Sequence, residues 1–141
     1  MAYQYRKTIH MRDTDATGVL YFANQFSLAL EAFEHFLSDH GFILGSCLLP
    51  IVHAEADFTA PLKLWDVVDI SLYCSKIGTS SFTIESVISG FGRVQIVHVF
   101  TDSGGVKQPV SSALRSLLLK LRPADQACPG NLVGQSSELD A

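Results

Sequence analysis

Residues 24–40 read NQFSLALEAFEHFLSDH, and apolar side chains recur in this stretch at the three- and four-residue spacing of an α-helix. Polar side chains fill the opposite side, and Gly41 follows directly, which is typical of a helix C-terminus. The stretch therefore predicts one long helix with a single buried stripe. The predicted stripe comprises Phe26, Ala29, Leu30, Phe33, Phe36 and Leu37, and the predicted polar side comprises Gln25, Glu31, Glu34, Ser38 and Asp39.

Strand patterns lie on both sides of this helix. Residues 3–10 predict a short strand before it, and residues 51–58 alternate strictly between apolar and polar side chains after it. Three further strands are predicted over 67–76, 81–88 and 93–101, separated by Gly78-Thr79-Ser80 and by Gly90-Phe91-Gly92. Connections of this length favour antiparallel hairpins. A shorter second helix is predicted over 111–121.

This order of elements predicts an α+β domain in which one helix packs on one antiparallel sheet. One helix leaves an edge and a face of the sheet uncovered, so we expect at least a dimer. The folded domain is predicted to span residues 1–122. Residues 123–141 are rich in Pro, Gly, Gln and Ser and have little apolar periodicity, so they are predicted to form a flexible tail.

Length and charge narrow the class of protein. A chain of 141 residues fits one domain, and a net charge of −4 with a pI near 5.6 leaves no basic field for nucleic acid. The three cysteines, Cys47, Cys74 and Cys128, lack metal-site spacing and are interpreted as buried or incidental thiols. The N-terminus has no apolar signal segment, and no stretch is long and apolar enough to span a membrane. We expect a soluble, cytoplasmic protein.

The stretch before the helix, residues 12–22, reads RDTDATGVLYF and carries the candidate chemistry. The N–H groups of a helix's first turn lack intrahelical partners, and the helix dipole adds positive charge there, so an oxyanion is stabilised at that end. Asp15 lies just before this end and could activate water or attack a substrate itself. The same pattern also suits a helix cap or a turn, so the residues alone leave both interpretations open.

The motif Asp13-x-Asp15-x-x-Gly18-x-x-Tyr21-Phe22, the aromatic-rich helix and the strand PIVHAEADF at 50–58 resemble hotdog-fold thioesterases of the 4-hydroxybenzoyl-CoA type. The resemblance covers residues 3–121. It implies a five- to six-stranded antiparallel sheet wrapped around one central helix, with active sites at a dimer interface and often a tetramer. Within the family, the chain most resembles the branch that hydrolyses 1,4-dihydroxy-2-naphthoyl-CoA in phylloquinone biosynthesis. No cofactor is implied, because CoA is part of the substrate.

The resemblance also assigns roles to single residues. The family's catalytic carboxylate falls on Asp15, and the backbone N–H that polarises the thioester carbonyl falls on Phe22. Gly18 is expected to let the chain approach the substrate closely. From the residues themselves, Tyr21 and Thr59 are candidate substrate contacts, but Tyr21 suits the core equally well and Thr59 suits the end of a strand. Whether Asp15 acts as a nucleophile or as a general base stays open.

Several other polar residues are alternative candidates for a functional role. Asp13 is interpreted as a structural turn residue. Glu31 and Glu34 are rival carboxylates, because another branch of hotdog thioesterases takes its acid from the central helix, but their place on the polar side predicts a solvated face. His53 is interpreted as a hydrogen-bonded structural imidazole that could still line the acyl pocket. The remaining histidines are dispersed, so no metal site is predicted; they are His10, His35, His40 and His98.

Alternatives stay open for the residues that contact the CoA phosphates and for the class of reaction. The turn at 78–80 lacks the basic residues that the family often has there, and only Lys76 is close, which puts the phosphate contacts in doubt. A hydratase would need a paired histidine and acid, and no such motif is present. A non-catalytic acyl-CoA-binding dimer and a thioesterase acting on 4-hydroxybenzoyl-CoA or on other acyl-CoA or acyl-carrier thioesters remain alternatives.

Overall fold

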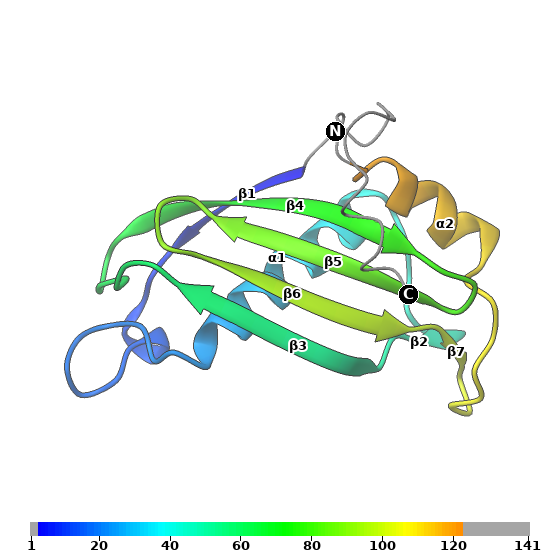
Figure 1. Ribbon diagram of the computed structural model, residues 1–141, viewed down its shortest axis with the longest axis horizontal. Helices are drawn as coiled ribbons and strands as arrows, with labels where there is room; N and C mark the ends of the chain where they lie inside the picture. Colours follow the sequence, from blue (N-terminus) through cyan, green and yellow to red (C-terminus); the bar gives the residue numbers. More distant parts are fainter. Residues whose placement is uncertain (1–2, 123–141) are drawn as a thin grey trace.

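The computed structural model describes residues 3–122. One curved antiparallel sheet and one long helix make up most of this part of the chain (Figure 1). The folded domain predicted over residues 1–122 coincides with it except for the first two residues. The tail predicted over residues 123–141, with Cys128, lies outside the described residues.

The main sheet has five strands in the order β1-β4-β5-β6-β3, and every neighbouring pair is antiparallel. The strands are β1 (Tyr3–Thr8), β3 (Ile51–Phe58), β4 (Val67–Ile77), β5 (Ser81–Ile88) and β6 (Gly92–Val99). All five predicted strands are therefore confirmed, with differences in the bounds of three of them. The first strand ends at Thr8, β4 extends to Ile77, and β6 begins at Gly92 and ends before Phe100. Beyond it, β7 (Thr101–Asp102) pairs with β2 (Cys47–Leu48) in a small second sheet that the sequence pattern does not predict.

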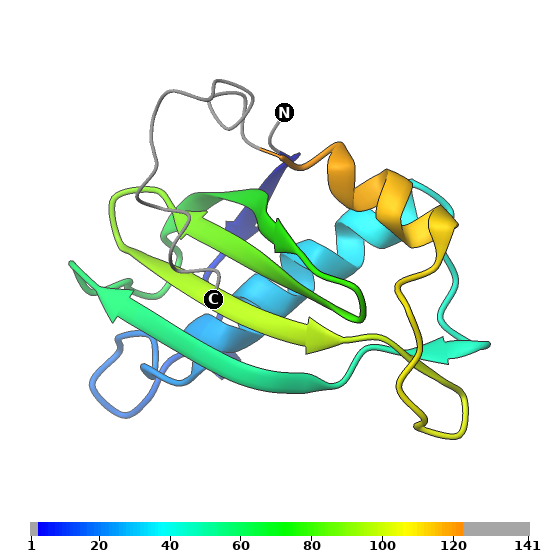
Figure 2. The same cartoon turned by 45° about the vertical axis from the view of Figure 1, so that its right-hand side comes forward.

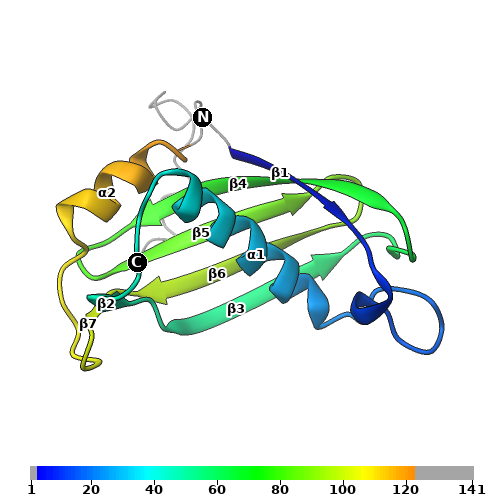
Figure 3. The ribbon, with the colours of Figure 1, turned by 180° about the vertical axis from the view of Figure 1, so that it is seen from behind.

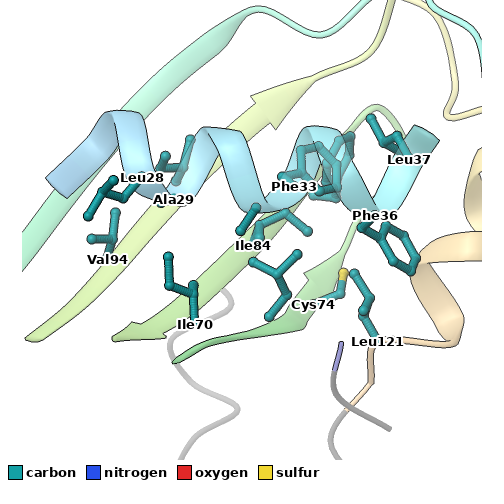
Figure 4. Close-up of a cluster of buried hydrophobic side chains, with 14 of the residues drawn as sticks. Leu28, Ala29, Phe33, Phe36, Leu37, Ile70, Cys74, Ile84, Val94 and Leu121 are labelled. Carbon is teal, nitrogen blue, oxygen red and sulfur yellow. The ribbon is translucent and has the colours of Figure 1, made fainter. Parts of the chain in front are cut away.

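Helix α1 (Asn24–Asp39) crosses one face of the main sheet diagonally (Figure 3). Its aromatic and aliphatic side chains point into the concave face of the strands, where they meet residues such as Ile70, Ile84 and Val94 (Figure 4). The second helix, α2 (Ser112–Leu119), begins where the Ser111 hydroxyl accepts a hydrogen bond from the Leu114 N–H at 3.2 Å. It packs against β4 near the C-terminal end of α1 (Figure 2).

The buried stripe of α1 is rotated from the predicted one. The buried residues are Gln25, Leu28, Ala29, Ala32, Phe33, Phe36 and Leu37. Phe26 and Leu30 lie at the margin and are only partly buried. The polar assignment of Gln25 was wrong, because this side chain is 1% exposed and lies on the same face as Leu28 and Ala29. Hydropathy assigns an amide to water, whereas position on the helix places Gln25 against the sheet.

Strand β3 forms one edge of the main sheet and is exposed along its length. Its alternation predicted one covered face, yet Val52 is 61% exposed and Phe58 is 49% exposed. Ala56 is partly buried against the core, and the rest of the apolar side of β3 is left exposed by the residues that the structure describes.

Candidate active site

The segment between β1 and α1 forms a loop at one end of the sheet, beyond the C-terminal end of β3 (Figures 1 and 3). It begins with a short 3-10 turn, η1 (Met11–Asp13). The chain then reverses between Asp15 and Val19, where the Asp15 N–H donates to the Val19 carbonyl at 3.0 Å and the Gly18 N–H donates to the Asp15 carbonyl at 3.0 Å. This reversal explains why the two acids precede a glycine.

Gly18 adopts a φ of +80°, a conformation that side chains with a Cβ rarely take. A Cβ built on Gly18 would meet no atom of the described chain within 4 Å. The expectation that Gly18 permits a close approach is therefore not supported by any contact within this chain. The turn conformation is the physical reason for glycine here.

Backbone hydrogen bonds fasten this loop to the segment that follows β3. The Leu20 N–H donates to the Leu62 carbonyl at 2.6 Å, and Val19 forms a β-bridge with Lys63. The Leu64 N–H donates to the Gly18 carbonyl at 3.3 Å. These bonds place the loop beside the bend that closes β3, so residues far apart in the sequence share one end of the sheet.

Asp15 is exposed, and its carboxylate is held by Thr17. The Thr17 hydroxyl donates to Oδ1 at 2.5 Å and the Thr17 N–H donates to the same oxygen at 2.8 Å. These bonds, the one from the hydroxyl first, lower the pKa of Asp15 below its ordinary value of 3.8. The sequence places Asp15 beside the positive end of the helix dipole, but the pKa of Asp15 is lowered first by the hydrogen bonds from Thr17.

Phe22 lies in the turn that leads into α1, two residues before the first helical residue. The Asn24 N–H donates to the Tyr21 carbonyl at 2.8 Å, and the Gln25 N–H donates to the Phe22 carbonyl at 3.3 Å. Within residues 3–122 the Phe22 N–H donates to no backbone carbonyl. This N–H is therefore available to an external acceptor, as the predicted role requires, although it precedes the helix rather than opening it.

An open hollow of about 380 Å³ lies between the loop and the end of β3. It is lined by Val19, Leu20, Phe22, Gln25, Phe58, Thr59, Ala60, Pro61 and Leu62. The rings of Phe22 and Phe58 meet edge to face across it, with centroids 6.2 Å apart. Tyr21 stands beside Phe22 at a centroid distance of 5.0 Å and is 46% exposed. The structure therefore brings together Phe22 and Thr59 in the hollow, with Tyr21 and the Asp15–Gly18 turn at its side.

Asp13 fixes the start of this arrangement. Its carboxylate accepts a hydrogen bond from the His10 N–H at 2.9 Å, and its carbonyl accepts from the Tyr21 N–H at 3.1 Å and from Asn24 Nδ2 at 2.9 Å. The buried Lys7 Nζ lies 3.9 Å from the Asp13 carboxylate. These contacts are those of the structural turn residue that the sequence predicts.

Glu31 is only partly on the predicted solvated face, because its side chain is 32% exposed and has partners on β1. Lys7 Nζ, on a residue that is 6% exposed, lies 3.3 Å from Glu31 Oε1, and the Tyr5 hydroxyl donates to Glu31 Oε2. Both partners come from β1, which covers this side of α1. Glu31 thereby has structural partners, whereas Glu34 is exposed as predicted.

His53 and Lys76 lie away from the hollow within one chain. The ring of His53 is bound to Glu55 on the same strand, Nε2 to Oε1 at 2.9 Å. Phe58 lies five positions further along β3, about 16 Å of extended chain. Lys76 stands at the end of β4, near the β4–β5 turn and at the opposite end of the sheet (Figure 1). Neither residue lines the hollow within residues 3–122.

The described residues also bear on metal binding, on the cysteine thiols and on membrane-spanning helices. Within the described part of the chain, no group of three His, Cys, Asp or Glu side chains is placed to hold a metal ion. Cys47 and Cys74 are buried free thiols, and burial raises the pKa of Cys74 to about 11. No helix among residues 3–122 has the length and hydropathy needed to cross a membrane.

Sequence relatives point to a single kind of protein. A 1,4-dihydroxy-2-naphthoyl-CoA hydrolase of Picosynechococcus sp. is 43% identical over 90 residues, which cover 60% of this chain and 62% of the relative. A 1,4-dihydroxy-2-naphthoyl-CoA hydrolase of Synechococcus elongatus is 37% identical over 112 residues, covering 72% of this chain and 82% of the relative. The match to the first relative thus spans about three-fifths of its length.

The comparison of folds agrees. The crystal structure of a 1,4-dihydroxy-2-naphthoyl-CoA thioesterase from Synechocystis superposes with a TM-score of 0.76 at 26% identity, covering 86% of this chain and 98% of that one. The family model of the thioesterase-like superfamily matches residues 9–118, which include the loop, α1 and the whole main sheet except β1. The chain has the hotdog fold and belongs to the thioesterase-like superfamily.

Proposed function

We propose that this protein hydrolyses an aromatic acyl-CoA thioester to the free acid and CoA, with 1,4-dihydroxy-2-naphthoyl-CoA of phylloquinone biosynthesis as the substrate. The observation that carries the proposal is the ionised Asp15 carboxylate on a loop whose next residues, Val19 to Phe22, border a largely apolar hollow. The two sequence relatives and the solved structure described above are named for that substrate. A hollow of about 380 Å³ is of a size for a flat bicyclic acyl group.

The proposed chemistry follows from the two groups at the loop. The thioester carbonyl oxygen accepts a hydrogen bond from the Phe22 N–H, which stabilises the negative charge that develops as the carbonyl carbon is attacked. Thr17 occupies Asp15 Oδ1, which leaves Oδ2 for the reaction. As a general base, Asp15 takes a proton from the attacking water; the C–S bond then breaks, and the CoA thiolate takes up a proton.

The nucleophilic route uses the same atoms in a different order. Asp15 Oδ2 attacks the carbonyl carbon, the C–S bond breaks with release of CoA, and water then hydrolyses the acyl–Asp15 anhydride to the acid and the free carboxylate. Both routes need Asp15 ionised before attack. The lowered pKa of Asp15 supports either one.

A second subunit is part of the proposal. The exposed edge and the exposed apolar residues of β3 support a homodimer formed through this strand, assembled further into a homotetramer. Because Lys76 and His53 lie away from the hollow of their own chain, a partner subunit is the source of any contact that they make with acyl-CoA. We place the reaction in the cytoplasm, in keeping with an acyl-CoA substrate.

Thiol release from a panel of acyl-CoA esters at equal concentration tests the proposal. The panel includes 1,4-dihydroxy-2-naphthoyl, 4-hydroxybenzoyl and long-chain fatty acyl esters. We expect the hydroxynaphthoyl ester to give the highest kcat/KM. A preference for long aliphatic chains would remove the proposed substrate and leave the chemistry standing, and release from no ester would favour a non-catalytic acyl-CoA-binding dimer.

The same assay tests the catalytic acid. Asp15→Asn should lower kcat by several orders of magnitude, roughly 10³-fold or more, with little change in thermal stability, because the side chain is exposed. Glu31→Gln is the matched control: it changes a carboxylate that has structural partners and should leave most of the activity. The reverse result would assign catalysis to the central helix.

A further inference from the structure

Gln25 is a polar residue in the hollow to which the proposed reaction gives no role. It lies in the first turn of α1 and lines the hollow together with Phe22 and Phe58. Its side chain is 1% exposed, so it belongs to the wall and not to the rim. Apart from Gln25 and Thr59, all the residues that line the hollow have apolar side chains.

The amide oxygen of Gln25 is unsatisfied. Within residues 3–122, Oε1 is the one buried side-chain oxygen or nitrogen that has no hydrogen-bond partner. Buried acceptors in native proteins are nearly always hydrogen-bonded, because an unpaired one loses its bonds to water without replacement. An orphaned acceptor in the wall of an otherwise apolar hollow points to a donor that arrives with a ligand.

The strand opposite makes room for this amide. A Cβ on Gly92, the first residue of β6, would lie 2.4 Å from Gln25 Nε2 and 2.6 Å from the Asp57 carbonyl oxygen. Glycine at this position therefore lets the amide lie against the backbone of β6. The terminal torsion of a glutamine side chain has a broad minimum, so the amide plane can turn Oε1 toward the hollow without moving the helix.

We propose that Gln25 Oε1 accepts a hydrogen bond from a hydroxyl group on the acyl ring of the substrate, which makes Gln25 a specificity-determining residue for hydroxylated aromatic thioesters. This inference rests on the proposed function and deepens it. A ring with a hydroxyl satisfies the buried acceptor, whereas the same ring without one leaves it unpaired, and sites of this kind reject the analogue that lacks the group. Aliphatic acyl chains are disfavoured for the same reason.

Binding measurements test this role separately from turnover. In the full-length Asp15→Asn protein, titration calorimetry with 1,4-dihydroxy-2-naphthoyl-CoA and with 2-naphthoyl-CoA gives the ratio of the two Kd values. We expect the hydroxylated ester to bind about 10-fold more tightly, the discrimination that one buried hydrogen bond supplies. Adding Gln25→Met, which keeps the side-chain length but removes the amide, should reduce this ratio to about 1, mainly by weakening the hydroxylated ester.

Two further variants sharpen the result. Gln25→Asn keeps the amide but withdraws it by one methylene, and it should also abolish the ratio, so the test survives if the methionine variant does not fold. Thr59→Val removes the other polar side chain of the hollow and should leave the ratio unchanged. If Thr59→Val changes the ratio of the two Kd values and Gln25→Met does not, Thr59 and not Gln25 discriminates between the esters.

The remaining outcomes are decisive. Equal weakening of both esters by Gln25→Met would give the residue a purely structural role, and an unchanged ratio or the absence of binding by either ester would overturn the proposal. Thiol release by the wild-type protein is measured in parallel. If the wild-type protein releases no thiol but the tighter binding of the hydroxylated ester persists, the proposed hydrolysis is contradicted and the recognition role of Gln25 stands. If thiol is released but the two esters bind equally, the hydrolysis stands and the recognition role is contradicted.

Discussion

Asp15 is held by its own turn and not by the helix that follows it. The Thr17 hydroxyl and N–H both bind Oδ1, and together they keep the carboxylate ionised and oriented. The sequence motif made Asp15 a candidate, because an acid before a glycine turn and a helix is a recognisable pattern. It left a cap or turn role open, and only the family resemblance assigned the catalytic role. It did not identify Thr17, because a threonine two residues after an acid has no distinctive spacing until the turn is formed.

Removing the Thr17 hydroxyl should change the pH dependence of the reaction. The hydroxyl favours the ionised form of Asp15 and lowers its pKa, so Thr17→Val should raise that pKa toward 3.8. Activity that needs ionised Asp15 is lost as the pH falls through this pKa, so the acid limb of kcat/KM should move to higher pH. Rates of thiol release from about pH 3 to about pH 7 measure the limb.

Thr14→Val is the matched control for this prediction. The Thr14 hydroxyl lies on the same loop but donates to the Met11 carbonyl at 2.8 Å and not to Asp15. Its removal should leave the acid limb in place. Coincident limbs for wild type and Thr17→Val would show that Thr17 does not set the pKa of the catalytic group.

At the scale of the elements, β1 and α1 are joined by a buried cation. Lys7 on β1 faces Asp13 of the 3-10 turn and Glu31 of the helix at 3.9 Å and 3.3 Å, and so it connects the three elements that carry the loop. Periodicity predicted the helix and the strand, because each pattern is local. It could not predict that β1 covers Glu31, since the partner of a helix's polar side is set by the path of the sheet.

Lys7→Met should lower the free energy of unfolding by about 2 kcal/mol, because it removes a buried cation from the Asp13 carboxylate, which is 14% exposed, and from the Glu31 carboxylate, which is 32% exposed. Urea denaturation measures the change. Arg6→Met is the control on the neighbouring position: Arg6 Nε binds Asp69 at 2.9 Å, but the two side chains are 73% and 45% exposed. That exposed pair should contribute much less to stability, because solvent screens the two charges. Equal losses in the two variants would contradict a structural role for the buried cation.

The buried His98 on β6 should make the stability of the protein depend on pH. The ring is 3% exposed, stacks on Phe82 with centroids 5.1 Å apart, and its Nδ1 lies 3.0 Å from the Leu49 carbonyl oxygen. Burial lowers the pKa of His98 below 6.5, partly opposed by the bond to Leu49. The unfolded chain therefore binds the proton more tightly, so stability is fully present above pH 6.5 and declines as the pH falls below it.

The comparison of wild type with His98→Asn isolates this contribution. Asparagine offers an amide donor to Leu49 but does not titrate, so the variant should be less stable overall and less sensitive to pH. Urea midpoints at about pH 7.5 and about pH 5 measure both properties. Parallel losses of stability on acidification in the two proteins would show that His98 is not the titrating group.

At the scale of the whole molecule, the main sheet has an exposed edge strand, β3. β3 presents exposed apolar residues to solvent along an edge, and the hollow opens beside its C-terminal end. The strand alternation predicted two distinct faces for β3 but could not show that most of both faces stays exposed in the described part of the chain. It also missed β2 and β7, because strands of two residues carry no periodic signal.

Val52→Lys should weaken assembly if β3 pairs with a second copy. Val52 is 61% exposed on the edge strand, and a lysine there places charge in the proposed interface. Sedimentation velocity should show a shift toward the monomer. Val106→Lys is the control, because Val106 is 59% exposed but follows β7, outside that edge. A monomeric wild-type protein, or an equal shift in both variants, would contradict assembly through β3.

The backbone bonds that join Gly18, Val19 and Leu20 to residues 62–64 have an evolutionary consequence. Because main-chain groups alone make these bonds, replacing Val19, Leu20 or Leu62 reshapes the wall of the hollow without releasing the loop. Acyl preference can therefore diverge by single substitutions while the position of Asp15 is inherited unchanged. For enzyme engineering, the side chains at these wall positions can be varied without moving the reacting groups.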